Sequence, residues 1–521
     1  MTGRQYNRVG VPGVFGPGST TGLPLNETTV AAQLKKKDYA TAIMGKWHLG
    51  QRAMFLPGAR GFDEYLGIPY SDDMGEARAT PCTPGDIPQD ISRTPVDRDD
   101  MTAMYEKAGF YDAAEQGVVH DGRASDPGTG LLPLVYQVNG STSVLEQPLD
   151  FTNLPLHYNK FATGFIERNA HKPFFLYMPF SHVHTTAGDQ PEMQYAGCMW
   201  KNATRRGMFG DALAEVDWII GNVVAELEKQ GVANNTLILF TGDNGPWMVR
   251  GKSGGSPGLF YGRTSGYWNT GKGSTWEGGI HEAGFAHWPG TIAPATRTFE
   301  VVSSMDLFPT ASALAGIPLP TDRVYDGKDM TDVLLGKGPS KHEFLFFYGG
   351  GGCSNGGPSA VRFGQYKAHW CTAPGLGGCQ DEGGKPCPKL SFKTKGAARL
   401  VPLMFNIGED PSEAYPLNLA GWKAANAGIN TLDTTVDCSD KSLTADDAAA
   451  CEAIMAAYEV ELKTFTKGKL VAPPKLPSEA GGVAVCCDRS KQCDCDGAPT
   501  FLAGKMDDVP AHAAAQWFGG N

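Results

Sequence analysis

The sequence predicts an α/β fold, with a mixed, mostly parallel β-sheet flanked by helices and a smaller C-terminal antiparallel sheet that carries a helix. Short apolar runs alternate with helical patterns between residues 30 and 240. Gly (67) and Pro (36) are frequent among the 521 residues, which is typical of many turns rather than a helical bundle. Beyond about residue 335 the apolar runs become shorter. We therefore predict two domains, residues 1–335 and 336–521.

The first domain begins with a predicted helix over 30–37, because Asn26 to Thr29 resembles a helix start. An apolar strand follows and ends at Met44. Apolar positions at helical spacing predict a long helix over 208–227, between strands at 173–178 and 236–240. Strand, helix and strand with crossovers of this length indicate parallel pairing and a sheet covered on both faces.

Two regions depart from this alternation. Residues 75–150 are rich in Pro, Gly and Asp, and we predict a long loop over the active face. In the second domain we predict four short antiparallel strands and one helix. Their ranges are 344–348, 360–363, 366–370 and 402–406 for the strands, and 445–465 for the helix.

Charge and hydropathy exclude two classes of partner. The chain has 45 Lys and Arg against 56 Asp and Glu, with no basic run, so we expect no nucleic-acid surface. No stretch is apolar over the roughly 20 residues that a membrane helix needs. The sequence gives no indication of the oligomeric state.

Cysteines and glycosylation sequons favour an oxidising, secretory compartment, lysosomal or extracellular. The twelve cysteines include a cluster at 486–495, which suits disulfides better than zinc because no Cys-x-x-Cys pair or histidine lies nearby. Asn26, Asn139, Asn202 and Asn234 each begin an Asn-x-Ser/Thr sequon. Met1 to Gln5 shows no apolar signal segment, so we expect the N-terminal part of the protein to lie upstream.

The stretch from Gly45 to Gly50 carries the strongest functional signal. Lys46 and His48 are two residues apart at the end of a predicted strand, where side chains alternate between faces. The two groups can therefore point the same way, and together they suit an anionic substrate.

Three further segments carry candidate site residues. Asp243 and Asn244 follow the strand at 236–240 and offer oxygens for Ca²⁺ or Mg²⁺, although an Asx turn is the alternative. Lys272 lies in a glycine-rich loop and suits an oxyanion, unless it is a solvated loop lysine. His182 and His184 are either loop histidines or half of a zinc site whose third ligand we do not find.

In their order along the chain, ten segments resemble the sulfatase family, and the arylsulfatases within it. They are Thr2 to Arg4, Leu23 to Leu25, Gly45 to Gly50, Leu66 to Ser71, Phe209 to Asp211, Asp243 to Gly245, Gly271 to Gly279, His287 to Gly290, Tyr366 to His369 and the final cysteine cluster. The resemblance implies an alkaline-phosphatase-like fold and a hydrolase of sulfate esters on small molecules, glycolipids or glycans.

The same resemblance implies roles for individual residues. Lys46 and Lys272 would bind sulfate oxygens, and His48 would assist a catalytic aldehyde hydrate. Ser71 would lie on the substrate side, and Asp243 and Asn244 would bind calcium. His184, rather than His182, would protonate the leaving oxygen, although the family usually has a proline two residues later where Thr186 stands here.

The family's nucleophile is a formylglycine made by a formylglycine-generating enzyme from the cysteine of Cys-x-Pro-Ser-Arg, shortly before Thr-Gly-Arg. Since Thr2 to Arg4 opens this chain, the motif would lie upstream of Met1, together with a first strand that supplies aspartate calcium ligands. Cys82 begins a sequence that lacks the Ser and Arg, so we expect a structural cysteine there.

We expect the 521-residue chain alone to be inactive toward aryl sulfates. Two alternatives stay open at this point. One is a phosphatase or phosphodiesterase of the same superfamily, and the other is a non-catalytic glycoprotein that keeps the fold for binding.

Overall fold

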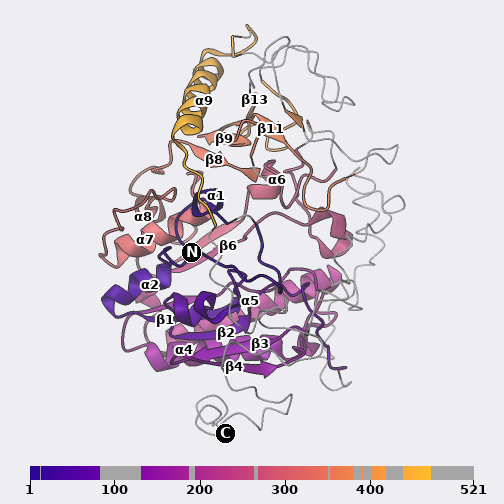
Figure 1. The fold of residues 1–521 in the computed structure, drawn as a ribbon, viewed down its shortest axis with the longest axis vertical. Helices are drawn as coiled ribbons and strands as arrows, with labels where there is room; N and C mark the ends of the chain where they lie inside the picture. Colours follow the sequence, from indigo (N-terminus) through magenta and orange to yellow (C-terminus); the bar gives the residue numbers. More distant parts are fainter. Residues whose placement is uncertain are drawn as a thin grey trace.

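The computed structural model describes residues 1–82, 131–186, 194–379, 390–391, 402–417 and 438–470, apart from residues 12, 263, 265–267, 350–351 and 440. Its long axis runs from a five-stranded sheet at one end to a C-terminal sheet and helix at the other, and the N-terminus lies between them (Figure 1).

The large sheet is mixed, in the order β4-β3-β2-β1-β5. β1 is parallel to β2 and β5, whereas β2 pairs antiparallel with β3 and β3 with β4. The strands are β1 (Ala40–Lys46), β2 (Glu64–Ile68), β3 (Leu134–Val138), β4 (Ser141–Glu146) and β5 (Phe174–Tyr177). The predicted α/β fold is confirmed, with parallel pairing around β1.

The prediction of a loop over 75–150 is wrong at its C-terminal end. β3 and β4 form a hairpin there, and residues 83–130 lie outside the described residues. The hairpin turns at Asn139 and Gly140, which both have positive φ (51° and 77°). Asn-Gly is the preferred pair for a two-residue hairpin turn, so these two residues already indicated a hairpin.

Helices pack on this sheet through apolar faces. Thr29 caps α2 (Val30–Leu34) by accepting a hydrogen bond from the Ala32 backbone N–H, as the sequence predicted. α2 packs against α7 (Leu307–Leu314), and α4 (Leu154–Asn169) packs against α5 (Gly207–Lys229). The predicted helix at 208–227 is therefore confirmed as α5.

The apolar run at 236–240, which suits a buried strand, forms β6 (Ile238–Thr241), yet two of its four residues are exposed and two are half-buried. It pairs antiparallel with β7 (Gly284–His287) in a separate two-stranded sheet. Ile238 of β6 and Phe174 of β5 belong to one apolar cluster with buried residues of α4 and α5. β5 and β6 thus pack on the same layer of helices but do not pair with each other. Among the described residues, β5 pairs only with β1 and β6 only with β7, so each strand has one edge that no described strand borders.

The C-terminal sheet is antiparallel, in the order β13-β10-β9-β8, as predicted. Its strands are β8 (Leu345–Phe347), β9 (Ala360–Phe363), β10 (Tyr366–His369) and β13 (Leu403–Asn406). α9 (Ala445–Thr464) packs on β9, and Tyr458 of α9 stacks on Trp370 with ring centroids 3.9 Å apart. The cysteine cluster at 486–495 lies outside the described residues.

Three disulfides join described cysteines. Cys82 bonds to Cys198, Cys353 to Cys371 and Cys438 to Cys451. Cys82 is therefore a structural cysteine, as expected. Within the described part of the chain, no helix combines the length and apolar character needed to cross a bilayer.

Candidate active site

The site begins where β1 ends. A Cβ on Gly45 would lie 2.1 Å from the Pro179 carbonyl oxygen, so glycine is required for this close approach. Lys46 follows, and its Nζ donates to Ser71 Oγ at 2.9 Å. His48 lies beyond the strand with φ of 55°, so strand alternation does not orient it as we predicted. A turn brings it beside Lys46 instead.

The environment of His48 keeps its imidazole neutral. Burial first, then the positive charge of Lys46 and the nearby His184 and Lys272, lower its pKa to about 3. Its Nε2 is buried and has no hydrogen-bond partner among the described residues. A neutral imidazole with a free ring nitrogen can accept or donate a hydrogen bond to a reacting group.

Lys272 reaches the same site from the glycine-rich loop. A Cβ on Gly271 would lie 2.2 Å from the Pro246 carbonyl oxygen, and that oxygen accepts the Lys272 backbone N–H at 2.8 Å. Burial, followed by repulsion from Lys46, lowers the pKa of Lys272. Two ammonium groups held this close together in a partly dehydrated site favour an anionic ligand.

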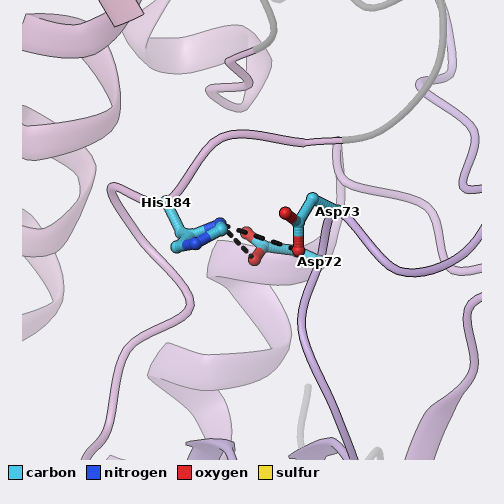
Figure 2. A group of neighbouring side chains, drawn as sticks. All are labelled: Asp72, Asp73 and His184. Atoms are coloured by element: carbon cyan, nitrogen blue, oxygen red, sulfur yellow. Dashed lines mark ion pairs between the residues drawn. The ribbon is translucent and has the colours of Figure 1, made fainter. Parts of the chain in front are cut away.

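His184 faces two carboxylates that follow Ser71. Its Nδ1 lies 3.4 Å from Asp72 Oδ1 and 4.0 Å from Asp73 Oδ1 (Figure 2). The same Nδ1 lies 2.9 Å from the Thr185 carbonyl oxygen, which can only accept, so Nδ1 carries a hydrogen. Although these three side chains could contribute a metal site, that hydrogen leaves Nδ1 no lone pair for a metal.

His182 does not join the site residues. Its Nε2 lies 2.6 Å from Oε1 of the buried Glu215 on α5, and Glu215 Oε2 accepts the Gly197 backbone N–H. His182 therefore connects its loop to α5 through Glu215. His184, in contrast, lies among the predicted site residues.

Trp247 lies close to both His184 and Lys272. Its ring centroid lies 5.6 Å from that of His184 and 5.2 Å from Lys272 Nζ. The indole N–H donates to the Leu376 carbonyl, and Arg250 also lies over the ring, at 4.3 Å. Because charged groups already cover Trp247, we infer that it orients these groups rather than stacking on a substrate.

Asp243 and Asn244 fit a hard cation. Asn244 Nδ2 donates to the Gly245 carbonyl, which leaves the amide oxygen available as a ligand. The Glu282 carboxylate lies against Gly242, and burial followed by the charge of Asp243 raises its pKa to about 7. Glu282 Oε1 is buried, and no residue in the described ranges forms a hydrogen bond with it. A divalent cation would relieve this repulsion between carboxylates.

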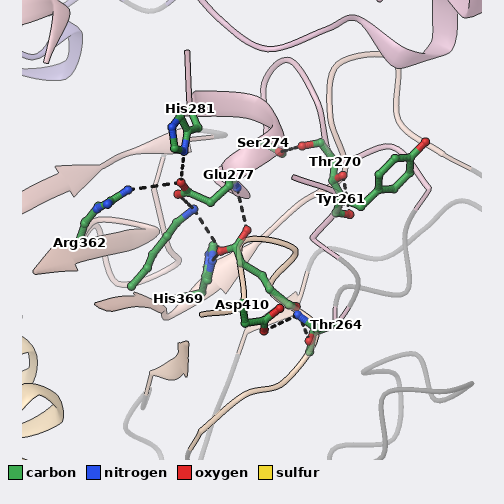
Figure 3. Close-up of polar contacts among 12 residues, drawn as sticks. Tyr261, Thr264, Thr270, Ser274, Glu277, His281, Arg362, His369 and Asp410 are labelled. Atoms are coloured by element: carbon green, nitrogen blue, oxygen red, sulfur yellow. Dashed lines mark hydrogen bonds and ion pairs between the residues drawn. The ribbon is translucent and has the colours of Figure 1, made fainter. Parts of the chain in front are cut away.

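A buried charged cluster, formed by Glu277, Lys367, His369 and Glu413, connects the Lys272 loop to the C-terminal sheet. Figure 3 labels Glu277 and His369 of this cluster. Lys367 Nζ lies 2.7 Å from Glu277 Oε1 and 3.2 Å from Glu413 Oε1. His369 Nε2 lies 2.8 Å from Glu413 Oε1, and Glu413 Oε2 accepts the Glu277 backbone N–H. The C-terminal sheet thus holds the end of the loop that presents Lys272.

Sequence reasoning missed several of these residues. Asp72 and Asp73 directly follow Ser71, and this carboxylate pair beside a predicted substrate residue was a usable signal. Lys367 and His369 alternate along a predicted strand, so they share a face. Nothing local in the sequence pointed to Trp247 or Glu282.

Comparison with known proteins decides the family. The family model described as Sulfatase matches residues 1–317, and the one described as C-terminal region of aryl-sulfatase matches residues 340–495. This chain belongs to the sulfatase family. Human arylsulfatase A is 36% identical over 422 residues, which cover 80% of this chain and 72% of the human protein.

Other sulfatases are similar over a comparable length. Human arylsulfatase G is 34% identical over 81% of this chain and 73% of its own, and rat steryl-sulfatase is 34% identical over 80% and 75%. A Pseudoalteromonas sulfatase, PsFucS1, shares the fold with a TM-score of 0.58 and 23% identity, covering 90% of this chain and 80% of its own. These names place the chain among sulfate ester hydrolases.

Proposed function

We propose that this sulfatase hydrolyses sulfate esters of the arylsulfatase type, with Lys46, His48, His184 and Lys272 as catalytic residues. The supporting observation is the convergence, next to Ser71, of two lysines and two histidines that come from three segments of the chain. Asp243 lies within the electrostatic reach of Lys272. Sulfated small molecules, glycolipids or glycans are the proposed substrates.

The chain's own residues bind the sulfate and move one proton. Lys46 and Lys272 stabilise the charge on the sulfuryl oxygens, and Lys46 also donates to Ser71 at the substrate side. His184 gives a proton to the leaving oxygen, and neutral His48 exchanges hydrogen bonds with the nucleophile. Asp243 and Asn244 would hold Ca²⁺, or Mg²⁺, which adds positive charge beside the same oxygens.

The nucleophile in this proposal is the hydroxyl of a hydrated formylglycine, formed by a formylglycine-generating enzyme on a segment upstream of Met1. The edges of β5 and β6 that no strand borders in the described part of the chain are compatible with such a segment. Both strands contact the α4 and α5 layer, and Phe285 on β7 is 65% exposed. A strand inserted between them would cover apolar surface and satisfy backbone groups.

The proposed compartment is the secretory pathway, with a lysosomal or extracellular destination. The side chains of Asn26, Asn139, Asn202 and Asn234 are all exposed, as glycosylation requires. Disulfides at Cys82–Cys198 and Cys353–Cys371 also suit an oxidising compartment.

The test compares two proteins and two substrates. The protein with its upstream segment, co-expressed with a formylglycine-generating enzyme and supplied with Ca²⁺, should hydrolyse 4-nitrophenyl sulfate and leave 4-nitrophenyl phosphate nearly untouched. The 521-residue chain alone should show no turnover above background. Preference for the phosphate ester would favour a phosphatase instead. Binding of sulfated ligands without turnover by the extended protein would favour the binding-glycoprotein alternative.

A further inference from the structure

We propose that Asp72 and Asp73 are positioning residues that hold His184 as the proton donor to the leaving group. The inference rests on the proposed function, because it concerns the acid of that reaction. It starts from the carboxylate pair that follows β2 and Ser71.

The geometry defines which nitrogen of His184 can deliver a proton. Nδ1–H donates to the Thr185 carbonyl at 2.9 Å, with Asp72 Oδ1 at 3.4 Å and Asp73 Oδ1 at 4.0 Å (Figure 2). Carbonyl and carboxylate oxygens all accept, so three acceptors surround this one N–H. Nε2 is therefore the nitrogen left to carry the transferable proton.

The carboxylates also balance the charges around the ring. Burial by itself would raise the pKa of Asp73, but His184, a Ser71 hydrogen bond, Lys46 and Lys272 together lower it below its usual range. His48 faces the same space and stays neutral. The carboxylates offset the positive charge that Lys46 and Lys272 place around the ring. Asp72, which is 3% exposed, supplies negative charge where water cannot screen it.

The proton transfer balances within this geometry. As the sulfur–oxygen bond to the leaving group breaks, its electron pair stays on the leaving oxygen. The proton on His184 Nε2 moves to that oxygen, and the imidazolium becomes neutral imidazole. The hydrogen on Nδ1 stays with the Thr185 carbonyl and the carboxylates, so the ring keeps its orientation for the next cycle.

Leaving-group dependence tests this role, because protonation matters most for a poor leaving group. In the formylglycine-bearing protein, Asp72→Asn should lower kcat for an alkyl or sugar sulfate by about 10²-fold. The same variant should lower kcat for 4-nitrophenyl sulfate by less than about 10-fold, since nitrophenolate leaves without protonation. Asp73→Asn should show the same contrast with a smaller amplitude because it lies farther from Nδ1.

The control is Asp217→Asn, which removes an exposed carboxylate from α5 and should change neither rate. Thermal midpoints of all variants should match the unmodified protein, and Asp73→Asn carries the test if Asp72→Asn fails to fold. Equal losses on both esters, or no loss in either variant, would overturn the inference while the proposed function stands. Failure of the unmodified protein to hydrolyse either ester would overturn both.

Discussion

At the scale of single residues, the site holds two lysines together against their mutual repulsion. Burial and Lys46 lower the pKa of Lys272, and Trp247 lies 5.2 Å from its Nζ. The folded chain therefore maintains a concentration of positive charge that a sulfate dianion or monoester would neutralise. Because these charges are already in place, they can stabilise the sulfuryl group without further reorganisation of the site.

Removing one of these charges should lower the catalytic efficiency, kcat/KM, rather than the stability of the fold. We expect Lys272→Ala to lower kcat/KM for 4-nitrophenyl sulfate by about 10²–10³-fold in the formylglycine-bearing protein, as for loss of one oxyanion donor. Steady-state kinetics checks this. Lys252→Ala removes an exposed lysine from the same region and should leave kcat/KM unchanged. A Lys272→Ala enzyme with unaltered kcat/KM would contradict the role.

His48 should add an acid-labile contribution to stability. Its pKa is about 3 in the folded chain against 6.5 for an ordinary histidine, because of burial and then Lys46. Between these pH values the unfolded state binds a proton that the folded state does not. This contribution is fully present above pH 6.5 and is lost as the pH falls toward 3.

The measurement is the thermal midpoint against pH for the chain and for His48→Gln. The chain should lose more stability than the variant between about pH 6.5 and 4, by up to a few kcal/mol. His171→Gln, outside the site, serves as the matched control. Parallel curves for the chain and His48→Gln would show that His48 titrates normally.

At the scale of elements, the buried charged cluster connects β10 of the C-terminal sheet to α6 (Glu277–Ile280), which follows the Lys272 loop. Lys367 is fully buried and contacts both Glu277 and Glu413. Lys367→Met should destabilise the protein by up to about 3–5 kcal/mol, because two buried carboxylates lose the ammonium group that they share. Arg362 still lies 3.4 Å from Glu277, and His369 still lies 2.8 Å from Glu413. Unfolding midpoints measure this loss.

A surface pair provides the contrast for that prediction. Lys341 lies 2.9 Å from Asp329 and is 45% exposed, so Lys341→Met should cost no more than about 1 kcal/mol. Combining Lys367→Met with Glu277→Gln and Glu413→Gln should recover part of the lost stability, since no buried charge is then unpaired. A Lys367→Met effect no larger than that of Lys341→Met would refute the cluster's importance.

Also at this scale, local chemistry accounts for the elements that the sequence predicted. Thr29 starts α2 through its side-chain cap, and Thr444 and Asp447 form a capping box at the start of α9. β9 spans the residues that we predicted, because its apolar run ends at a tight turn. Asn139 and Gly140 defined a hairpin that overall loop-like composition concealed.

At the scale of the whole molecule, the edges of β5 and β6 that no described strand borders matter most. If an upstream segment adds a strand there, as proposed above, a protein that carries it should unfold at a clearly higher temperature than the 521-residue chain, because that strand would bury exposed apolar surface. Calorimetry compares the two proteins. Equal midpoints, with equal protection of β5 and β6 amides from hydrogen exchange, would argue against strand insertion.

The sequence by itself determined the α/β class, most element positions and the segments that carry Lys46, Ser71, Asp243 and Lys272. These depend on local periodicity, capping and spacing, which a chain carries in any conformation. The sulfatase resemblance supplied their proposed roles.

Only the tertiary structure decided which of these groups meet. The two histidines differ in their partners. His184 contacts Asp72 and Asp73, whereas His182 contacts Glu215. Burial and close charges from distant segments lower the pKa of His48, and β10 reaches back to Glu277 across the chain. Such contacts and the low-dielectric environment around them exist only after packing, so no local pattern encodes them.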